Sequence, residues 1–338
     1  MIVVLKPNIP KRDEAAVLRE IKKLGYKPHV MRGVERVVIG AIGDERTHQD
    51  LNALLTWPQV ERVMAVQKRY KLVSREAHKG NSRITLTNGT VIGGKKFVVM
   101  AGPCSVESEK QLMTTASAVA KAGAKVLRGG AFKPRTSPYE FQGLGEKGLK
   151  MLAKARKETG LAIITELLSE QHAELVAEYA DILQIGARNA QNFQLLIAAA
   201  KTGRPVLLKR GLSMKIEEWL LAGEYVLANN NANLMFCERG IRTFETYTRN
   251  TLDLSTIPII KNESHCPIVI DPSQGAGRAD LVAAMCKGAV AMGADSLLIE
   301  VHPNPAEAWS DGAQQVSLEL FAKLMEELKP FVAAAGRE

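Results

Sequence analysis

A repeat of short apolar runs, each followed by a polar or Gly-rich turn and an amphipathic stretch, limits the fold most strongly. It starts at Phe97 and continues for about 240 residues, and the runs are FVVMAGP, KVLRGGA, AIITELL, ILQIGAR, VLLKRG, LMFCERG, PIVIDPS and SLLIEVHP. Helical spacing recurs between them, at 109–123, 146–160, 169–180 and 279–294. Eight strands alternating with helices predict an α/β chain with a (β/α)8 TIM barrel. An open doubly wound sheet is the alternative, although no GxGxxG follows the first run.

The first seventy or so residues follow a different pattern, which predicts a small ferredoxin-like α+β domain. Strands are expected at 1–6, 27–33, 36–43 and 60–73, and helices at 15–26 and 48–57. This part carries no cluster of His, Cys, Asp or Glu that would suggest chemistry, so we expect regulation or binding, with a structural cap as the alternative. Residues 74–83 are polar, and 84–94 predict a hairpin around Asn88-Gly89. The predicted domains are 1–72 (regulatory), 73–96 (linker and hairpin) and 97–338 (catalytic barrel).

Composition excludes several classes of protein. The net charge of +9 permits anionic partners, but aromatic residues make up only 5% and no run of five basic residues occurs, so we expect no nucleic-acid groove. No stretch approaches 18 continuous apolar residues and no signal peptide is recognisable, so we expect no membrane span. Four scattered cysteines without a CxxC pair favour a reducing compartment, and hence the cytoplasm.

Polar residues gather at the predicted carboxyl ends of the strands, where the active sites of such barrels lie. They include Cys104, Arg128, Lys133, Arg135, Thr136, Glu166, Gln184, Arg188, Lys209, Arg210, Glu238, Arg239, Asp271, Gln274, Glu300, His302 and Asp311. One cation after a strand is usually a solvated loop charge. Five or six at one mouth would destabilise the fold unless anionic groups neutralised them. The mouth is therefore expected to bind more than one anionic group, for which Arg provides bidentate donors.

A second subset suggests metal chemistry. Cys104, Glu300 and Asp311 come from the first and last strands, which are neighbours once a barrel closes. A thiolate with carboxylates suits a divalent transition metal that acts as a Lewis acid. Each residue also has an ordinary alternative role, as a buried thiol, an ion-pair partner or a residue at the start of a helix. From these residues alone, the metal site is one hypothesis beside those alternatives.

Seven motifs identify a family resemblance: AGPCSVES at 101–108, LRGGAFKPRTSPYEFQGLGEKGL at 127–149, QIGARNAQNF at 184–193, LLKRG at 207–211, CERGIRTFE at 237–245, DPSQGAGR at 271–278 and EVHPNPAEAWSDG at 300–312. Together they resemble 3-deoxy-D-arabino-heptulosonate-7-phosphate (DAHP) synthase, in the subfamily with an N-terminal ferredoxin-like domain. The resemblance covers nearly the whole chain. It implies a (β/α)8 barrel that condenses phosphoenolpyruvate with erythrose 4-phosphate and water to give DAHP and phosphate, the first step of the shikimate pathway.

The resemblance also implies roles for individual residues. Phosphoenolpyruvate would be held by Arg128, Lys133, Arg188, Lys209 and Arg239, and the aldose phosphate by Lys133, Pro134, Arg135, Thr136 and Ser137. Lys133 would donate a proton to the developing alkoxide, and Cys104 would join it in the catalytic set. The family further implies feedback inhibition by an aromatic amino acid at the N-terminal domain and a homotetramer. Two alternatives remain: a related synthase that takes a five-carbon aldose phosphate, which the KPRTS motif disfavours, and a catalytically weak regulatory paralogue.

One position departs from the family pattern. The motif after the seventh strand is usually DPSH, whose His is a metal ligand, whereas this chain has DPSQ. The implied ligand set is therefore Cys104, Gln274, Glu300 and Asp311, for manganese, zinc or iron. An amide oxygen is a weaker ligand than imidazole for such metals. Three outcomes are open: Gln274 binds the metal weakly, a water takes its place, or the metal is dispensable.

Overall fold

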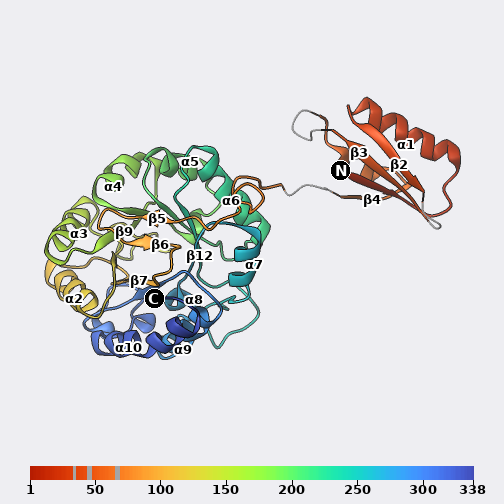
Figure 1. Ribbon diagram of the computed structural model, residues 1–338. Helices are drawn as coiled ribbons and strands as arrows, with labels where there is room; N and C mark the ends of the chain where they lie inside the picture. Colours follow the sequence, from red (N-terminus) through yellow and green to blue (C-terminus); the bar gives the residue numbers. More distant parts are fainter. Residues whose placement is uncertain (33–35, 44–47, 65–68) are drawn as a thin grey trace. The chain divides into compact units, whose positions relative to one another are not determined.

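The computed structural model describes residues 1–32, 36–43, 48–64 and 69–338, which divide into two compact units, Met1–Arg69 and Tyr70–Glu338 (Figure 1). The smaller unit consists of strand β1 (Ile2–Leu5), helix α1 (Lys11–Lys23), strands β2 (Lys27–Arg32) and β3 (Val37–Ile42), the 3₁₀ helix η1 (Leu51–Thr56) and strand β4 (Val60–Met64). Its antiparallel sheet has the order β2-β3-β1-β4. The predicted ferredoxin-like arrangement is confirmed.

Two predicted elements of this unit differ in extent or type. The helix expected at 48–57 is the shorter η1, which begins after Asp50, whose carboxylate accepts a hydrogen bond from the Asn52 N–H at 2.8 Å. The strand expected over 60–73 ends at Met64; residues 65–68 lie outside the described part, and Arg69 to Val73 are not in a strand. Gly33, at the end of the expected strand 27–33, also lies outside the described residues.

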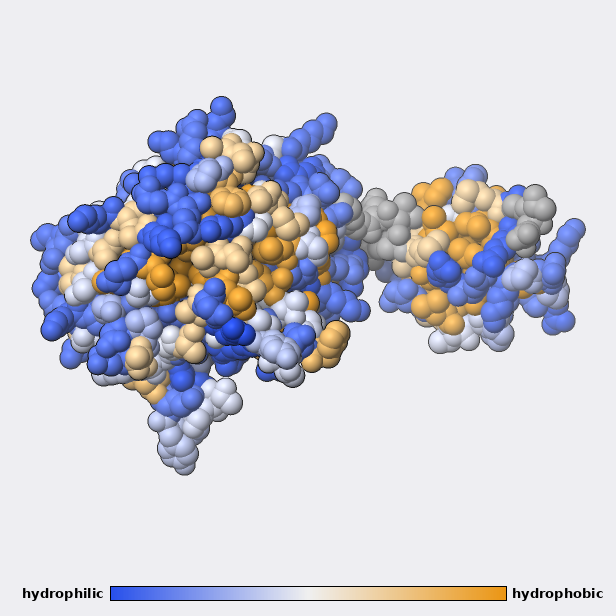
Figure 2. Space-filling model, turned by 90° about the horizontal axis from the view of Figure 1, so that it is seen from below, coloured by the Kyte–Doolittle hydropathy of each residue, from blue (hydrophilic) through white to orange (hydrophobic). Residues whose placement is uncertain are grey.

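The two faces of the small sheet have different surroundings. Val3, Leu5 and Ile39 are fully buried in a core that includes Val17 and Ile21 of α1. The alternate residues point to the other face, where pairing places Ile2 opposite Met64, Val4 opposite Val38, and Val38 opposite Met31. Met31 and Met64 are exposed, and apolar residues are visible on the surface of this unit in Figure 2. This face of the sheet therefore carries apolar residues, with Arg62 opposite Val4 and His29 opposite Gly40 among them.

The larger unit is a closed parallel barrel, which confirms the (β/α)8 prediction and excludes an open sheet. Its strands follow chain order around the ring: β7 (Val98–Gly102), β8 (Val126–Arg128), β9 (Ala162–Glu166), β10 (Ile182–Ile185), β11 (Val206–Lys209), β12 (Leu234–Glu238), β13 (Ile268–Ile270) and β14 (Ser296–Glu300). Around them lie α2 (Glu109–Lys121), α3 (Glu146–Thr159), α4 (Ala173–Tyr179), α5 (Phe193–Lys201), α6 (Ile216–Ala228), α7 (Thr256–Glu263), α9 (Ala279–Ala291) and α10 (Leu318–Ala334), with the short α8 (Pro272–Ala276) after β13.

A hairpin fills the amino end of the barrel. Strands β5 (Ile84–Thr85) and β6 (Val91–Ile92) place Ile84 and Ile92 in one apolar cluster with inward-facing strand residues such as Met100. The Asn88 amide nitrogen donates to the carbonyl oxygens of Lys125 and Gly160. Lys125 directly precedes strand β8, and Gly160 lies shortly before strand β9. Because apolar side chains fill this end, we expect the active site at the opposite, carboxyl end of the barrel.

The four free cysteines, all buried in the barrel unit, predict that stability falls at high pH. Burial raises the pKa of Cys104 to about 11 and that of Cys266 to about 12, and it also raises the pKa of Cys237 and Cys286. Above the unfolded thiol pKa of about 8.5, the unfolded chain loses protons that the folded chain keeps, so each thiol lowers the free energy of unfolding by about 1.4 kcal/mol per pH unit. Urea unfolding of the wild type and Cys286→Ala between pH 8 and pH 10 tests this. The variant should lose less stability over that interval; equal losses would contradict the assignment for Cys286.

Candidate active site

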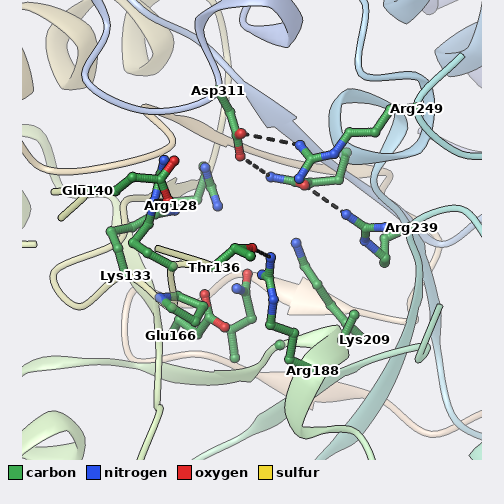
Figure 3. A pocket seen from close by; sticks show the side chains of 16 residues that line it. Arg128, Lys133, Thr136, Glu140, Glu166, Arg188, Lys209, Arg239, Arg249 and Asp311 are labelled. Carbon is green, nitrogen blue, oxygen red and sulfur yellow. Dashed lines mark hydrogen bonds and ion pairs between the residues drawn. The ribbon is translucent and has the colours of Figure 1, made fainter. Parts of the chain in front are cut away.

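A cavity of about 200 Å³ opens at the carboxyl ends of the barrel strands (Figure 3). It is lined by Arg128, Lys133, Pro134, Arg135, Thr136, Glu140, Glu166, Gln184, Gly186, Ala187, Arg188, Lys209, Arg239, Arg249, Gln274 and Asp311. Seven of these side chains are Lys or Arg and three are Asp or Glu. The excess of cations within one concave site matches the sequence-based expectation of an anion-binding mouth.

The deepest cations are fixed by buried carboxylates. Lys209 Nζ lies 2.6 Å from Asp271 Oδ2, and Arg128 Nη1 lies 2.8 Å from Glu300 Oε1. Within the described residues, Arg128 Nε and Arg239 Nη1 are buried donors without a hydrogen-bond partner. Buried donors are nearly always satisfied in folded proteins, so these two are ready to bind an acceptor brought in by a ligand.

Lys133 is held against Cys104. Its Nζ lies 3.1 Å from both the carbonyl oxygen and the Sγ of Cys104. Burial, followed by the charge of Glu300, raises the pKa of Cys104 to about 11, so this side chain is a neutral thiol at neutral pH. Burial lowers the pKa of Lys133, but electrostatic interactions with Cys104 first, and then with Glu166 and Glu300, outweigh it and the net shift is upward. Lys133 therefore enters the cavity as a protonated ammonium group.

Three of the predicted metal ligands lie together. The ligand atoms of Cys104, Glu300 and Asp311 are all within 4.8 Å of one another. Asp311 adopts a left-handed backbone conformation with φ of 49°, and its carboxylate contacts Arg249 Nη1 at 3.2 Å (Figure 3). Burial raises the pKa of Asp311, but the charges of Arg249 and Lys133 outweigh burial and lower it overall. A thiol and two carboxylates at this spacing are chemically able to hold a divalent cation.

Gln274 joins this cluster, but its amide oxygen faces away from the other ligand atoms. That oxygen accepts a hydrogen bond from Arg239 Nη2 at 2.8 Å. The amide nitrogen instead donates to Glu300 Oε1 at 3.0 Å and to Asp311 Oδ2 at 3.2 Å. An amide NH₂ group has no lone pair available for a metal, so the arrangement provides three ligands rather than four.

The rim of the cavity is formed by the loop after β8. Arg135 Nε lies 3.0 Å from Glu140 Oε2, and Arg188 Nη2 donates to Thr136 Oγ1 at 3.5 Å. Pro134 also lines the cavity. Ser137 is not among the lining residues; its backbone N–H lies 3.5 Å from Glu140 Oε2.

Some strand-end residues point elsewhere because neighbouring residues alternate between the two sides of a strand. Lys209 faces the cavity, whereas Arg210 pairs with Glu238 at 3.0 Å behind the barrel wall and also contacts Asp253. His302 lies 3.2 Å from Glu107 and is likewise absent from the lining. Sequence position at a strand end therefore did not by itself separate cavity residues from supporting ones.

Two charged lining residues had not been singled out in the sequence, Glu140 and Arg249. Each lies in a long loop, well beyond the end of the preceding strand, where the sequence pattern does not distinguish a cavity residue from a solvent-exposed one. Glu166 was noted as a strand end but given no role; its charge contributes to raising the pKa of Lys133. It reaches the cavity beside Gly186, where a Cβ atom would lie only 1.9 Å from Glu166 Oε1.

Comparisons with known proteins relate both units to DAHP synthases. Residues 77–334 match the family model described as DAHP synthetase I family, and residues 1–68 match the DAHP synthase ferredoxin-like domain. A phospho-2-dehydro-3-deoxyheptonate aldolase of Thermotoga maritima is 51% identical over 336 residues, which cover 99% of each chain. A 2-dehydro-3-deoxyphosphooctonate aldolase of Francisella tularensis is 31% identical over 268 residues, covering 73% of this chain and 96% of that protein.

Solved structures of DAHP synthase are similar to this chain as well. A crystal structure of the Thermotoga maritima enzyme, titled as DAHP synthase, superimposes with a TM-score of 0.94 at 50% identity, and covers 100% of this chain and 98% of that one. A truncated form of the 3-deoxy-D-arabino-heptulosonate 7-phosphate synthase from the same organism has a TM-score of 0.75, and covers 80% of this chain and 98% of that one. None of the helices in the described part of the chain combines the length and apolar character that a membrane crossing requires.

Proposed function

Because the chain belongs to the DAHP synthetase I family and carries that family's ferredoxin-like domain, we propose that it forms DAHP and phosphate from phosphoenolpyruvate, erythrose 4-phosphate and water. The protein is a 3-deoxy-7-phosphoheptulonate synthase that catalyses the first step of the shikimate pathway. The observation that carries this is 51% identity across 99% of both chains, joined to a cavity rich in cations. The five-carbon and regulatory alternatives are less supported, since the octonate aldolase match is weaker and spans less of the chain.

The cavity suits the two substrates in charge. Phosphoenolpyruvate brings a phosphate and a carboxylate, and erythrose 4-phosphate brings a second phosphate. For the first substrate we assign the buried cations Arg128, Lys133, Lys209 and Arg239 together with the exposed Arg188, supported by the unpaired donors on Arg128 and Arg239. For the aldose phosphate we assign the buried Lys133 and the rim residues Pro134, Arg135 and Thr136. Ser137 lies beside this group and supports it through Glu140.

The reaction joins C3 of phosphoenolpyruvate to the aldehyde carbon of the aldose, while water adds at C2 and phosphate leaves. Fixed cations hold both reactants in one orientation, which removes much of the entropic cost of their encounter. As the new bond forms, negative charge develops on the former aldehyde oxygen and requires a donor. Lys133 is protonated and buried in the cavity wall, so we assign it the transfer of a proton from Nζ to this oxygen.

Cys104, Glu300 and Asp311 are the residues that would hold a divalent cation, with manganese, zinc and iron(II) as candidates. Such an ion would supply Lewis-acid polarisation of the aldehyde oxygen. Gln274 turns its nitrogen, not its oxygen, toward the two carboxylates. With three ligands and no imidazole, the affinity for the metal should be lower than in a site with four.

The choice of aldose gives a testable prediction. We expect kcat/KM for erythrose 4-phosphate to exceed that for arabinose 5-phosphate by about 100-fold, because an additional hydroxymethylene unit displaces the aldehyde from C3 when the phosphate is fixed at the rim. Phosphate release measured with each aldose, and without any aldose as control, tests this. Equal values for the two sugars would favour the five-carbon alternative, and no release with either sugar would contradict a synthase.

The small unit is proposed to regulate the barrel. By resemblance we assign it, over residues 1–72, the binding of tyrosine or phenylalanine in a homotetramer. The apolar residues Ile2, Val38 and Met64 on one sheet face support this, because such residues are suited to contact an aromatic ligand or a second subunit. The cytoplasm is proposed as its location, since all four cysteines are free.

A further inference from the structure

The Gln274 side chain connects the substrate cations to the candidate metal ligands. Its oxygen is bound to Arg239, and its nitrogen is bound to both Glu300 and Asp311. Figure 3 shows the dashed contacts that run from Asp311 toward Arg239. The backbone of Gln274 is fixed as well: its N–H donates to Asp271 Oδ1 at 2.9 Å, and its carbonyl accepts from Asn250 Nδ2 at 2.9 Å. The residue is therefore held at both ends.

The chemistry of the three partners determines the orientation of the amide. Arg239 has donors only, and ionised carboxylates have acceptors only. A rotation of the amide by a half turn would place its NH₂ group against the guanidinium and its oxygen against two carboxylates. Three hydrogen bonds would be lost and three repulsive contacts made. Gln274 could act as a metal ligand through its oxygen only in that rotated state.

The candidate ligands are also satisfied by other donors. Cys104 Sγ lies 3.1 Å from Lys133 Nζ, Glu300 pairs with Arg128, and Asp311 pairs with Arg249. The second oxygen of Glu300 accepts from Gln314 Nε2 at 2.7 Å. Two carboxylates placed together normally need a cation between them, because their charges repel. Here the NH₂ group of Gln274 donates to both and provides that stabilisation with partial charge.

We propose that Gln274 takes over the structural role of a bound metal ion, so that this enzyme carries out its reaction without one. The inference rests on the proposed synthase activity. The amide keeps Glu300 and Asp311 together and holds Arg239 in place for phosphoenolpyruvate. Gln274 is thus a positioning residue in a metal-free site, and the alkoxide proton comes from Lys133. The family's metal-binding residues Cys104, Glu300 and Asp311 remain as members of a hydrogen-bond network.

The test combines metal content with activity. Purified full-length protein is treated with EDTA, its metal content is measured by mass spectrometry, and phosphate release is assayed before and after addition of Mn²⁺, Zn²⁺ or Fe²⁺. Co²⁺ is added separately, because a cobalt–thiolate bond at Cys104 gives a charge-transfer absorption that reports binding without any turnover. We expect metal-free protein to keep its full activity and to show no cobalt–thiolate absorption.

Gln274→His is the main variant. Imidazole gives the cluster a fourth ligand, so the variant should bind one Co²⁺ per chain with the cobalt–thiolate absorption. Its metal-free form should be roughly tenfold less active than the wild type, since a single ring cannot bridge Arg239 and both carboxylates, and added metal should restore it. Gln274→Glu is the second variant, in case the first does not fold. A third carboxylate cannot donate to the other two, so it should also gain Co²⁺ binding.

The outcomes distinguish failure of the metal-free site from failure of the proposed synthase activity. Wild-type activity that is lost with EDTA and restored by a metal, together with cobalt–thiolate absorption, would overturn the metal-free site and leave the synthase assignment intact. Absence of cobalt binding in both variants would also overturn it, because removal of the NH₂ bridge would then have no effect on the ligands. Wild type that releases no phosphate with or without metal would instead refute the proposed function.

Discussion

Lys133→Met should lower kcat for DAHP formation by about 10³-fold, the range expected when a general acid is removed. The ammonium group lies in the cavity wall, and negative groups around it keep it protonated. Methionine has nearly the same length without a charge or a proton, so no group remains at this position to donate to the developing alkoxide. Steady-state assays at saturating substrate measure the effect, and circular dichroism checks that the variant folds.

Lys133→Arg is the matched control. Arginine restores the positive charge but gives up its proton poorly, because its pKa exceeds about 12. If Lys133 acts as the acid, the arginine variant should recover part of the affinity for phosphoenolpyruvate and little of kcat. Recovery of kcat as well would mean that charge alone is required, and full activity of Lys133→Met would exclude Lys133 from proton transfer.

Lys209→Met should both inactivate the enzyme and destabilise the barrel, by about 3–5 kcal/mol. Lys209 and Asp271 form a buried pair at 2.6 Å, and both side chains are almost fully removed from solvent. Loss of the lysine leaves the Asp271 carboxylate buried without its counter-ion, although its other oxygen still accepts from the Gln274 N–H. Urea unfolding followed by circular dichroism gives the change in stability.

A double variant separates the two roles of Lys209. Asp271→Asn removes the uncompensated charge, so Lys209→Met with Asp271→Asn should regain much of the lost stability. Activity should stay low in the double variant, because the cation assigned to phosphoenolpyruvate is still missing. If activity returned together with stability, Lys209 would be a structural residue that does not bind the substrate.

The barrel could be predicted because each strand is a continuous apolar run and each run is followed by a helix. In the small unit, the bounds of the individual elements were predicted less accurately. Residues 48–57 have helical spacing, but Asp50 caps a short 3₁₀ turn there instead of a full helix. The run after Val60 is apolar enough to suggest a long strand, whereas β4 ends at Met64. Periodicity marks where an element lies but does not say how far its hydrogen bonds extend.

The site residues at strand ends were predicted from the strand pattern and the loop residues 133–136 from the family motif, whereas a charged residue deep in a long loop was missed. Arg128 and Lys209 end strands, Arg239 directly follows one, and all three reach the cavity. Arg249 reaches it from a long loop whose path depends on contacts such as that with Asp311. The rotation of the Gln274 amide depends on three partners from separate parts of the chain, so no local pattern could have indicated it.

The hairpin at the amino end of the barrel affects the order in which the two substrates can bind. Because Ile84 and Ile92 fill that end, the cavity communicates with solvent at the carboxyl end, where both substrates must enter. Three cations assigned to phosphoenolpyruvate alone, Arg128, Lys209 and Arg239, are buried, whereas Arg135 and Thr136, assigned to the aldose phosphate, lie at the rim. A sugar already in place would block the route to the deeper position. Binding should therefore be sequential, with the enol substrate first, and a dead-end complex should form when the sugar arrives too early.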